Sequence, residues 1–319
     1  MIRQKRTQKN YTPRSKLKVI QKEWYLNWQL YLLLFLPISY FILFKYVPIY
    51  GIQIAFKDFS IIDGVWGSPW VGFKHFITFF TDYRFFNIIG NTFILNIYQL
   101  IASFPIPILF ALSLNAVNCK GFKKTLQMIT YAPHFISTVV MVGMVFIFFS
   151  TRTGLFNQLL VGVGFEEVDF IGTASSFRHL YVWSGVWQSI GFNSIIYIAT
   201  LAGIDPTLHE AAIVDGASKF KRLIHIDLPG IMPTAIVLLI LNSGKILNLG
   251  FEKVLLMQND VNMQYSEIIA TYVYKTGLKS FIPQFSYSTA IGLFQSLIGL
   301  IMIISVNKLS QKFSESSLW

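Results

Sequence analysis

Six stretches of this chain are long and apolar enough to cross a membrane, since a spanning helix needs roughly 20 mostly apolar residues. They lie near residues 30–50, 88–115, 128–149, 180–204, 231–249 and 288–306. Of the 319 residues, 54% are hydrophobic and 13% are charged, whereas soluble domains carry about 25% charged residues. The single cysteine, Cys119, excludes an internal disulfide. The sequence therefore predicts an all-α polytopic membrane protein with six transmembrane helices.

The distribution of lysine and arginine predicts how these spans are oriented. Of the 26 basic residues, sixteen lie in the two terminal tails and in the loops 116–127 and 205–230, and eight lie in the other loops. Cytoplasmic loops carry the excess of Lys and Arg, so both termini are expected on the cytoplasmic side of the membrane. The net charge of +11 is then loop charge, and no nucleic-acid partner is needed to explain it.

The spans divide the chain into three predicted regions. Residues 1–29 form a basic cytoplasmic tail, whose first 22 residues are expected to be disordered or to lie on anionic lipid. Residues 30–306 form the six-span domain, with external loops at 51–87, 150–179 and 250–287. Residues 307–319 form a cytoplasmic C-terminal tail. The first loop contains tryptophans, which favour folding against the membrane surface, and Pro105 and Pro107 predict a kink in the second span.

The loop between the fourth and fifth spans, residues 205–230, carries strong helix signals. Asp205 suits an N-cap and Pro206 suits the first helical position. Gly216 suits the left-handed residue that ends a helix. Pro229 is expected to stop a second helix that begins near Ser218. The loop is therefore predicted to form a helix, a sharp turn, a second helix and a re-entry into the membrane.

The surface of the first of these helices favours the docking of another protein. Ala211 and Ala212 leave a smooth face that another backbone can approach, and Glu210 places a charge beside it. Asp215 falls in the last turn, where the helix dipole disfavours an anion. A partner that compensates this carboxylate would explain its position.

This loop resembles the EAA loop of ABC-importer permeases. The matching residues, at the spacing typical of that loop, are Glu210, Ala211, Ala212, Gly216, Ile226, Leu228 and Pro229. Other segments resemble sugar permeases related to the maltose transporter: FKYVP at 44–48, AFKDF at 55–59, GVWGSPWVGF at 64–73, YAPHF at 131–135 and GFEKV at 250–254. The resemblance covers about residues 30–310.

The resemblance implies the fold and partners of a type I ABC importer: two six-span permeases, two cytoplasmic ATPases and an extracytoplasmic solute-binding protein. The EAA helix would dock into the ATPase, so the matching residues, with Asp215, are the predicted ATPase-coupling residues. The family suggests that the second permease is a relative rather than a copy. ATP and Mg²⁺ would bind to the ATPases and no cofactor to this chain, since its only Gly-Lys pair, Gly244-Lys245, is not part of a Walker A sequence.

Polar and aromatic residues inside the spans are candidates for the substrate pathway, because such residues usually face a cavity or another helix. Trp183 and Trp187 lie four residues apart and hence on one helix face. Trp183 has interfacial anchoring as its alternative role, and Trp187 and Gln188 have helix packing. The full set of pathway candidates is Tyr98, Gln99, Trp183, Trp187, Gln188, Asn193, Asn242 and Lys245. Aromatic rings beside amides suit sugars, which present C–H faces and hydroxyl groups.

Lys245 lies about 21 Å into the fifth span, at about 1.5 Å per residue. That span contains no acidic residue, so the ammonium group needs a partner, a water-filled cavity or a path to the surface. One hypothesis is that Lys245 meets an anionic group of the substrate, such as a uronate carboxylate. The alternative is that it snorkels to the membrane surface.

Other chemistry has little support in the sequence. The five histidines lack metal-ligand spacing and no nucleophile motif occurs, so no metal site and no enzymatic activity are predicted. The predicted function is the import of an oligosaccharide, acidic under the Lys245 hypothesis, from a solute-binding protein by ATP-driven alternating access. A neutral oligosaccharide, a ligand sensor without net uptake and a secondary transporter are the alternatives, and the EAA loop argues against the last.

Overall fold

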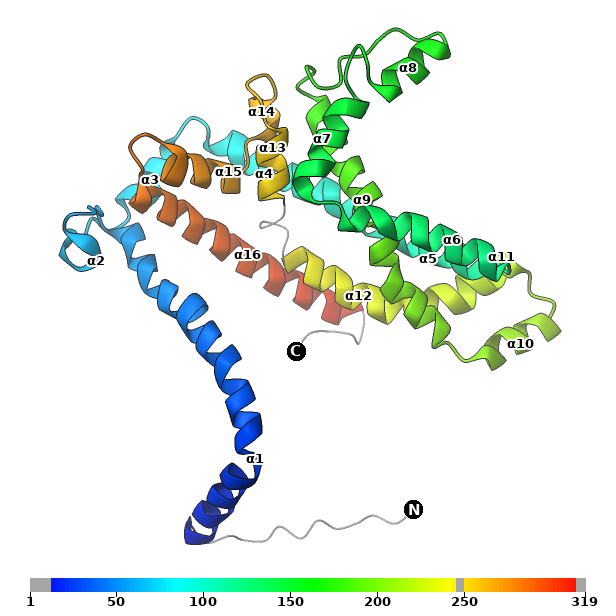
Figure 1. The fold of residues 1–319 in the computed structure, drawn as a ribbon, viewed down its shortest axis with the longest axis horizontal. Coiled ribbons are helices and arrows are strands. Elements are labelled where there is room, and N and C mark those ends of the chain that lie inside the picture. The colour runs from blue at the N-terminus through cyan, green and yellow to red at the C-terminus, as the bar shows by residue number, and fades with distance from the viewer. Residues whose placement is uncertain (1–12, 245–249, 314–319) are drawn as a thin grey trace.

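The computed structural model describes residues 13–244 and 250–313. These residues form helices joined by loops (Figure 1). The described part of the chain contains an isolated β-bridge between Lys57 and Trp70 but no strand. The predicted all-α class is therefore confirmed.

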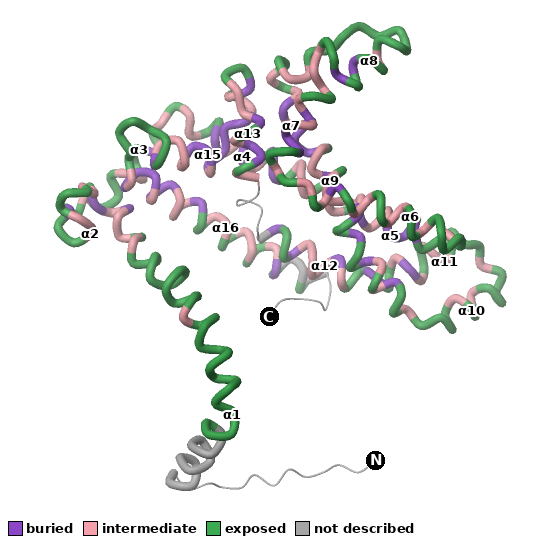
Figure 2. Tube along the Cα trace, in the orientation of Figure 1, coloured by how far each residue is buried: buried purple, intermediate pink, exposed green. Residues whose placement is uncertain are grey.

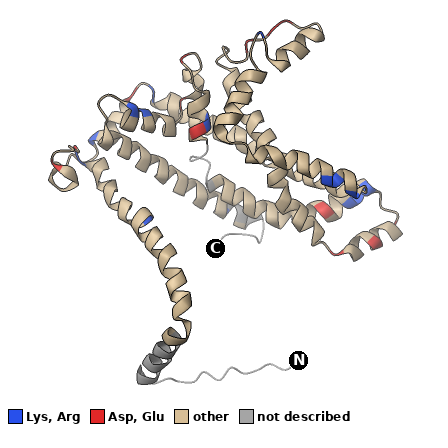
Figure 3. Ribbon diagram, viewed as in Figure 1, with Lys and Arg blue, Asp and Glu red and all other residues tan. Residues whose placement is uncertain are grey.

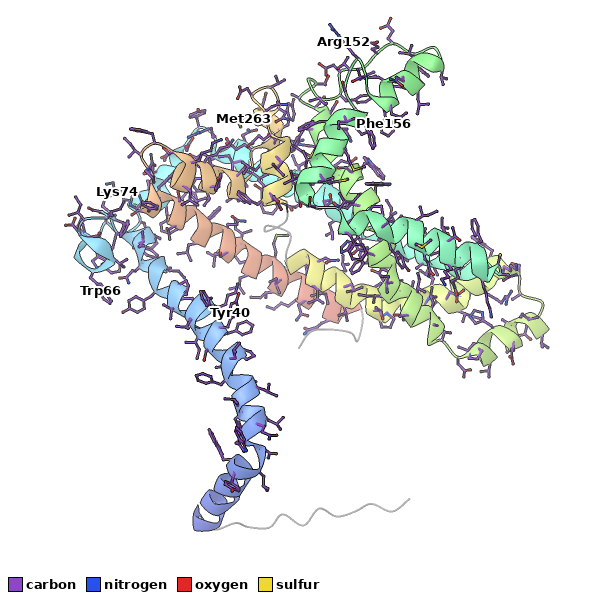
Figure 4. The ribbon with its side chains drawn as sticks, in the orientation of Figure 1. Tyr40, Trp66, Lys74, Arg152, Phe156 and Met263 are labelled. Atoms are coloured by element: carbon purple, nitrogen blue, oxygen red, sulfur yellow. The ribbon has the colours of Figure 1, made fainter. Side chains whose placement is uncertain are left out.

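The N-terminal segment forms a long apolar arm. It consists of α1 (Pro13–Phe41), the π-helical η1 (Ile42–Tyr46) and the 3₁₀-helical η2 (Val47–Phe56). The most apolar window of this arm is 0% buried by the rest of the protein, and Figure 2 colours most of the described part of the arm as exposed. In Figure 4, Tyr40 is one of the aromatic side chains that project from the arm with no helix facing them.

The start of the arm lies inside the predicted N-terminal tail, residues 1–29. α1 begins at Pro13, so disorder, one of the two alternatives for the first 22 residues, is wrong from that position onward. Contact of this segment with anionic lipid stays a prediction. The segment 13–29 is rich in Lys, Arg, Leu, Glu and Gln, which are good helix formers. Proline is also well tolerated at the start of a helix.

The segment after the arm is a folded connection. It contains α2 (Gly64–Gly67) and α3 (Lys74–Thr81). Lys57 is buried, with its Nζ donating to the Val65 carbonyl at 2.7 Å and lying 4.9 Å from the centre of the Trp70 ring. The predicted folding of the loop 51–87 is confirmed, while its contact with the membrane surface stays a prediction.

The second predicted span contains the expected interruption. α4 (Phe85–Ser103) ends and α5 (Pro105–Ala116) begins on either side of Phe104. A proline removes a helical hydrogen bond and its ring clashes with the preceding turn, which places the break just before Pro105.

The third predicted span is sharply bent. The pair α6 (Lys120–Tyr131) and η3 (Ala132–Phe135) meets α7 (Thr138–Phe148) at 105°. The prediction of one continuous helix over 128–149 is therefore wrong. Pro133 lies in η3, and Ser137 starts α7 afresh as an N-cap that accepts from the Val140 N–H.

The helix α9 (Ser176–Ala202) follows the short α8 (Leu155–Gly162) and lies at the centre of the packing. One hydrophobic cluster packs α9 against α4, α7 and α13 around Val182. A second packs it against α5 and α12 around Tyr197. A third joins α3, α4, α15 and α16 around Phe79.

The chain after α9 forms α10 (Pro206–Val214), α11 (Lys219–Arg222), the π-helical η4 (Leu223–Asp227) and α12 (Leu228–Gly244). The last three are continuous, so Lys219–Ser243 is one long helix. The prediction that Pro229 stops this helix is wrong. Pro229 follows η4, and the wider π-helical turn of η4 changes the hydrogen-bond pattern there. The helix therefore continues although proline lacks an N–H.

Residues 250–287, predicted as an external loop, are mostly folded into the bundle. They form α13 (Phe251–Met257), α14 (Met263–Ser266), α15 (Ile269–Tyr274), the π-helical η5 (Lys275–Lys279) and the start of α16 (Phe285–Phe313). Val254 and Ile269 are fully buried. Helices this short leave no long apolar window in a sequence. α16 also continues into the predicted C-terminal tail.

The described residues contain four helices that are long and apolar enough to span a membrane. They are Trp24–Phe56, Phe85–Ala116, Lys219–Ser243 and Phe285–Lys308, and the bent pair formed by α6, η3 and α7 would be a fifth span. α9, the fourth predicted span, has 27 residues, more than the roughly 20 that a crossing needs, but contains many polar residues. The multi-pass membrane class is confirmed, and a sixth crossing by α9 rests on its length.

Candidate functional site

The predicted coupling loop has the expected helix–turn–helix form at α10 and α11. Asp205 Oδ1 accepts from the Thr207 N–H at 2.9 Å, and this hydrogen bond holds the pKa of the Asp205 carboxyl below its usual value. Gly216 has φ +75°, the left-handed conformation that ends helices. Ser218 Oγ accepts from the Lys221 N–H at 3.3 Å and caps α11. These N-cap and C-terminal predictions are confirmed.

The predicted coupling residues lie on two elements. Glu210, Ala211, Ala212, Asp215 and Gly216 lie on α10 and its C-terminal turn, whereas Ile226, Leu228 and Pro229 lie in η4 and the first turn of α12. No residue of α10 is buried. Its apolar residue Val214 is 87% exposed. The helix therefore presents a free surface on which a partner could dock.

Basic residues gather near this helix. Figure 3 shows the Lys and Arg residues of α6 and α11 at the same end of the bundle as α10, which carries acidic residues. This grouping agrees with the two basic loops on which the predicted orientation rests. The side of the membrane stays a prediction.

Two of the three aromatic pathway candidates border a cavity of about 670 Å³ between α7, α8 and α9. Trp183 and Trp187 both line it, so their predicted common face is confirmed. Both side chains are about half exposed. Most of the other lining residues are apolar or aromatic: Met141, Met144, Val145, Phe148, Phe149, Leu155, Phe156, Phe170 and Leu180.

The hydroxyl of Tyr98 on α4 forms hydrogen bonds with two residues that line this cavity. The Trp183 Nε1–H donates to Tyr98 Oη at 2.9 Å, and the same hydroxyl is hydrogen-bonded to His179 Nδ1 at 2.9 Å. His179 also lines the cavity. Tyr98 therefore orients two rings from α9, and an apolar surface with a few polar groups is typical of small-molecule sites.

Two other candidates point elsewhere. Gln188 Nε2 donates to the Ile136 carbonyl at 2.9 Å, in the break between η3 and α7. Polar side chains satisfy backbone groups freed by such breaks, which favours the packing alternative for Gln188. The Gln99 amide and the Lys253 ammonium group lie against Gly185. Gly185 is two residues from both tryptophans and is therefore on the other side of α9.

Asn193 and Asn242 are brought together from α9 and α12. Both line a second cavity of about 300 Å³, which is also lined by Ser103 at the end of α4 and by Pro107 of α5. Asn193 lies ten residues beyond Trp183, which is about 15 Å along the helix. The candidates that line cavities therefore fall into two groups along α9. Lys245 lies outside the described residues.

A comparison with protein families decides which class of membrane protein carries this arrangement. Residues 75–315 match the family described as the binding-protein-dependent transport system inner membrane component. The chain belongs to this family. It is a permease subunit, a transport component rather than an enzyme, as predicted.

Similar proteins agree with this assignment. The permease is 44% identical over 303 residues to the polygalacturonan/rhamnogalacturonan transport system permease protein YteP of Bacillus subtilis, a match covering 95% of this chain and 92% of the relative. It is 38% identical, with TM-score 0.84, to a chain of a bacterial ABC transporter involved in the import of the acidic polysaccharide alginate, covering 92% of this chain and 98% of that chain. The predicted type I importer fold is confirmed.

A second structure of the alginate transporter includes a partner. Its permease chain is 36% identical, with TM-score 0.85 and coverage of 93% of this chain and 99% of that one, and the transporter is in complex with an alginate pentasaccharide-bound periplasmic protein. A structural relative of this permease therefore belongs to a transporter that binds an oligosaccharide-loaded periplasmic protein.

Two residues near the pathway candidates were not predicted from the sequence. His179 lies four residues before Trp183, so the helical spacing could have placed it on the same face. Lys253 falls in the predicted external loop 250–287, but it is buried. Its Nζ donates to the Tyr181 carbonyl at 2.8 Å and lies 4.8 Å from the Tyr181 ring centre. Nothing in its local sequence reveals that α13 folds against α9.

Tyr98→Phe tests whether the aromatic cavity contributes to transport. Removing the hydroxyl deletes two hydrogen bonds, each worth about 0.5–1.5 kcal/mol, and frees the Trp183 and His179 rings. We expect the KM for uptake to rise three- to tenfold with little change in permease abundance. Tyr83→Phe is the matched control because Tyr83 is 89% exposed on a loop. Equal KM values for Tyr98→Phe and wild type would show that this cavity is not part of the substrate pathway.

Proposed function

We propose that this permease forms half of the pathway of an ATP-driven importer for an acidic oligosaccharide. The observation that carries the proposal is the extensive similarity to two systems named for acidic polysaccharides, polygalacturonan at 44% identity and alginate at 38%. Polygalacturonan is a polymer of a uronic acid, so both polymers present carboxylates on sugar rings. The rings of Trp183 and Trp187 suit the C–H faces of such sugars.

The proposed transporter contains four kinds of subunit: this permease, a second and related permease, two ATPases and an extracytoplasmic binding protein. The exposed α10 supports docking on an ATPase. The unburied apolar arm from Trp24 to Phe56 supports contact with the second permease and the lipid. ATP and Mg²⁺ bind to the ATPases in this proposal, and this chain binds no cofactor.

The proposed orientation places both termini, α6, α10 and α11 on the cytoplasmic side of a bacterial cell membrane. The gathering of basic residues at that end of the bundle (Figure 3) supports it. ATP binding then draws the two ATPases together. α10 carries this movement to the spans, and the substrate pathway between the two permeases opens outward. Hydrolysis restores the inward-facing state, so the nucleotide acts by favouring one of two conformations.

Uptake by proteoliposomes tests the proposed cargo. The complete transporter is reconstituted, and labelled oligogalacturonate, oligoalginate and a neutral arabino-oligosaccharide are offered with the binding protein outside and ATP inside. Accumulation of an acidic oligosaccharide that requires ATP is the expected result. Accumulation of the neutral sugar alone would overturn the acidic cargo. ATP-dependent signalling without any accumulation would favour the sensor.

Lys245→Ala tests the contact with an anionic substrate. A carboxylate in a low-dielectric site loses several kcal/mol of interaction when its cationic partner is removed, because its charge is then left uncompensated. We therefore expect at least a tenfold loss of acidic oligosaccharide uptake. Lys279→Ala, at an exposed position in η5, is the matched control and should transport normally. Unchanged uptake of acidic and neutral oligosaccharides by Lys245→Ala would refute the contact.

A further inference from the structure

A small polar cluster joins α10 to the bundle. His209 Nε2 lies 3.3 Å from Asp227 Oδ1, and Asn115 Nδ2 donates to the same oxygen at 3.4 Å. The three residues come from different segments of the chain: His209 from α10, Asp227 from η4 and Asn115 from the last turn of α5. None of them is among the predicted coupling residues.

The Asp227 carboxylate is sheltered from water. Its side chain is 11% exposed, and the His209 side chain is 27% exposed. A sheltered carboxylate is unfavourable unless it accepts hydrogen bonds. An Nε2–H is present on the imidazolium and on one neutral tautomer, so His209 can donate in either charge state. The cluster therefore supplies a buried anion with donors from two other segments.

Apolar packing does little to hold α10 in place. No residue of α10 is buried. Leu208, Ile213 and Val214 are each more than half exposed. The chain then turns at Gly216 in the left-handed conformation. Without a side-chain attachment, α10 would be joined to the bundle chiefly through the loops at its two ends, and such loops bend easily.

The cluster lies at the ends of two helices that border a candidate pathway cavity. Asn115 is near the C-terminus of α5, and Asp227 directly precedes α12. The opposite parts of these helices contribute Pro107 and Asn242 to the cavity of about 300 Å³. A displacement of α10 that is passed to Asp227 and Asn115 therefore reaches both walls of this cavity.

We propose that His209, Asp227 and Asn115 are positioning residues that make α10 move as one body with α5 and α12. The inference rests on the proposed function, in which α10 docks on an ATPase. The cluster converts a push on an exposed helix into a movement of the spans. When it is broken, α10 pivots about its end loops, and ATP hydrolysis continues without moving the cavity walls.

Spin-label distance measurements test the attachment independently of the cargo. Labels are placed at Thr207→Cys on α10 and Ser113→Cys on α5, both exposed positions, in a Cys119→Ser background of the assembled transporter. We expect one narrow distance distribution for this parent and a broadened distribution after His209→Ala. A distribution that stays narrow after His209→Ala would overturn the proposal.

The ratio of uptake to ATP hydrolysis tests the functional consequence. We expect His209→Ala to lower the molecules of labelled acidic oligosaccharide imported per ATP by five- to tenfold. His209→Gln, which keeps an N–H donor, should retain at least half of the wild-type ratio. The double variant His209→Ala/Asp227→Leu should be no worse than the worse single variant, because residues that act as a unit are non-additive.

Two controls separate the possible failures. His225→Ala is the matched histidine control, since His225 Nδ1 contacts the Lys221 carbonyl of its own helical segment at 2.9 Å. A His209→Ala ratio equal to that of His225→Ala would overturn the role in coupling. If wild-type protein imports none of the tested acidic sugars, the proposed cargo fails, whereas the distance measurement still decides whether the cluster fixes α10.

Discussion

Replacing Glu210 with lysine is expected to lower ATP-driven uptake at least 20-fold without preventing membrane insertion. Glu210 is exposed on α10, so its reversal of charge leaves the packing of the permease intact. In a docked interface, opposite charges about 4 Å apart attract by about 4 kcal/mol at an effective dielectric constant of 20, and reversal turns this attraction into repulsion. Uptake and ATP hydrolysis, measured in the same proteoliposomes, report the effect.

Glu167→Lys is the matched control for this charge reversal. Glu167 is also an exposed glutamate, but it lies in the connection between α8 and α9, far along the chain from α10. It should insert and transport as the wild type does. Normal uptake by Glu210→Lys, in protein that assembles with the ATPase, would show that α10 does not couple ATP hydrolysis to transport.

Gly216→Val is expected to separate ATP hydrolysis from transport. Gly216 has φ +75°, and a side chain with a Cβ in this region costs roughly 1–2 kcal/mol, with β-branched residues among the worst. A Cβ built on Gly216 meets no atom within 4 Å, so the strain lies in the backbone and not in a clash. The turn after α10 should shift, and uptake should fall at least tenfold while at least half of the ATP hydrolysis remains.

Two substitutions make this experiment specific. Gly121→Val is the matched control, because Gly121 lies in α6 with similar open space around it but without a positive φ. Gly216→Asn should transport better than Gly216→Val, since asparagine tolerates the left-handed conformation. Equal uptake by Gly216→Val and wild type would show that the turn geometry does not matter for coupling.

Local signals in the sequence predicted α10 and its turn well. A capping aspartate, a proline at the first position and a glycine at the end act within a few residues, so Asp205, Pro206 and Gly216 specify this helix wherever the chain lies. The shared face of Trp183 and Trp187 followed in the same way from the helical period.

Features that depend on tertiary contacts could not be predicted in this way. The burial of Lys253 requires α13 to pack on α9, and the polar cluster at Asp227 requires three distant segments to meet. The bend after Pro133 and the unbroken helix through Pro229 show that a proline alone does not determine the path of a helix. In the first case Ser137 starts a new helix, and in the second η4 absorbs the irregularity.

The π-helical turn η4 sets the rotational phase between the docking loop and the membrane. Such a turn is commonly an α-helix with one extra residue, and each residue of an α-helix turns the chain by about 100°. Deleting one residue from Leu223–Asp227 would therefore rotate α11, and the turn that leads to α10, by roughly that angle about the axis of α12. Insertions and deletions in this stretch should thus be far less tolerated than substitutions, even though most of its side chains are accessible.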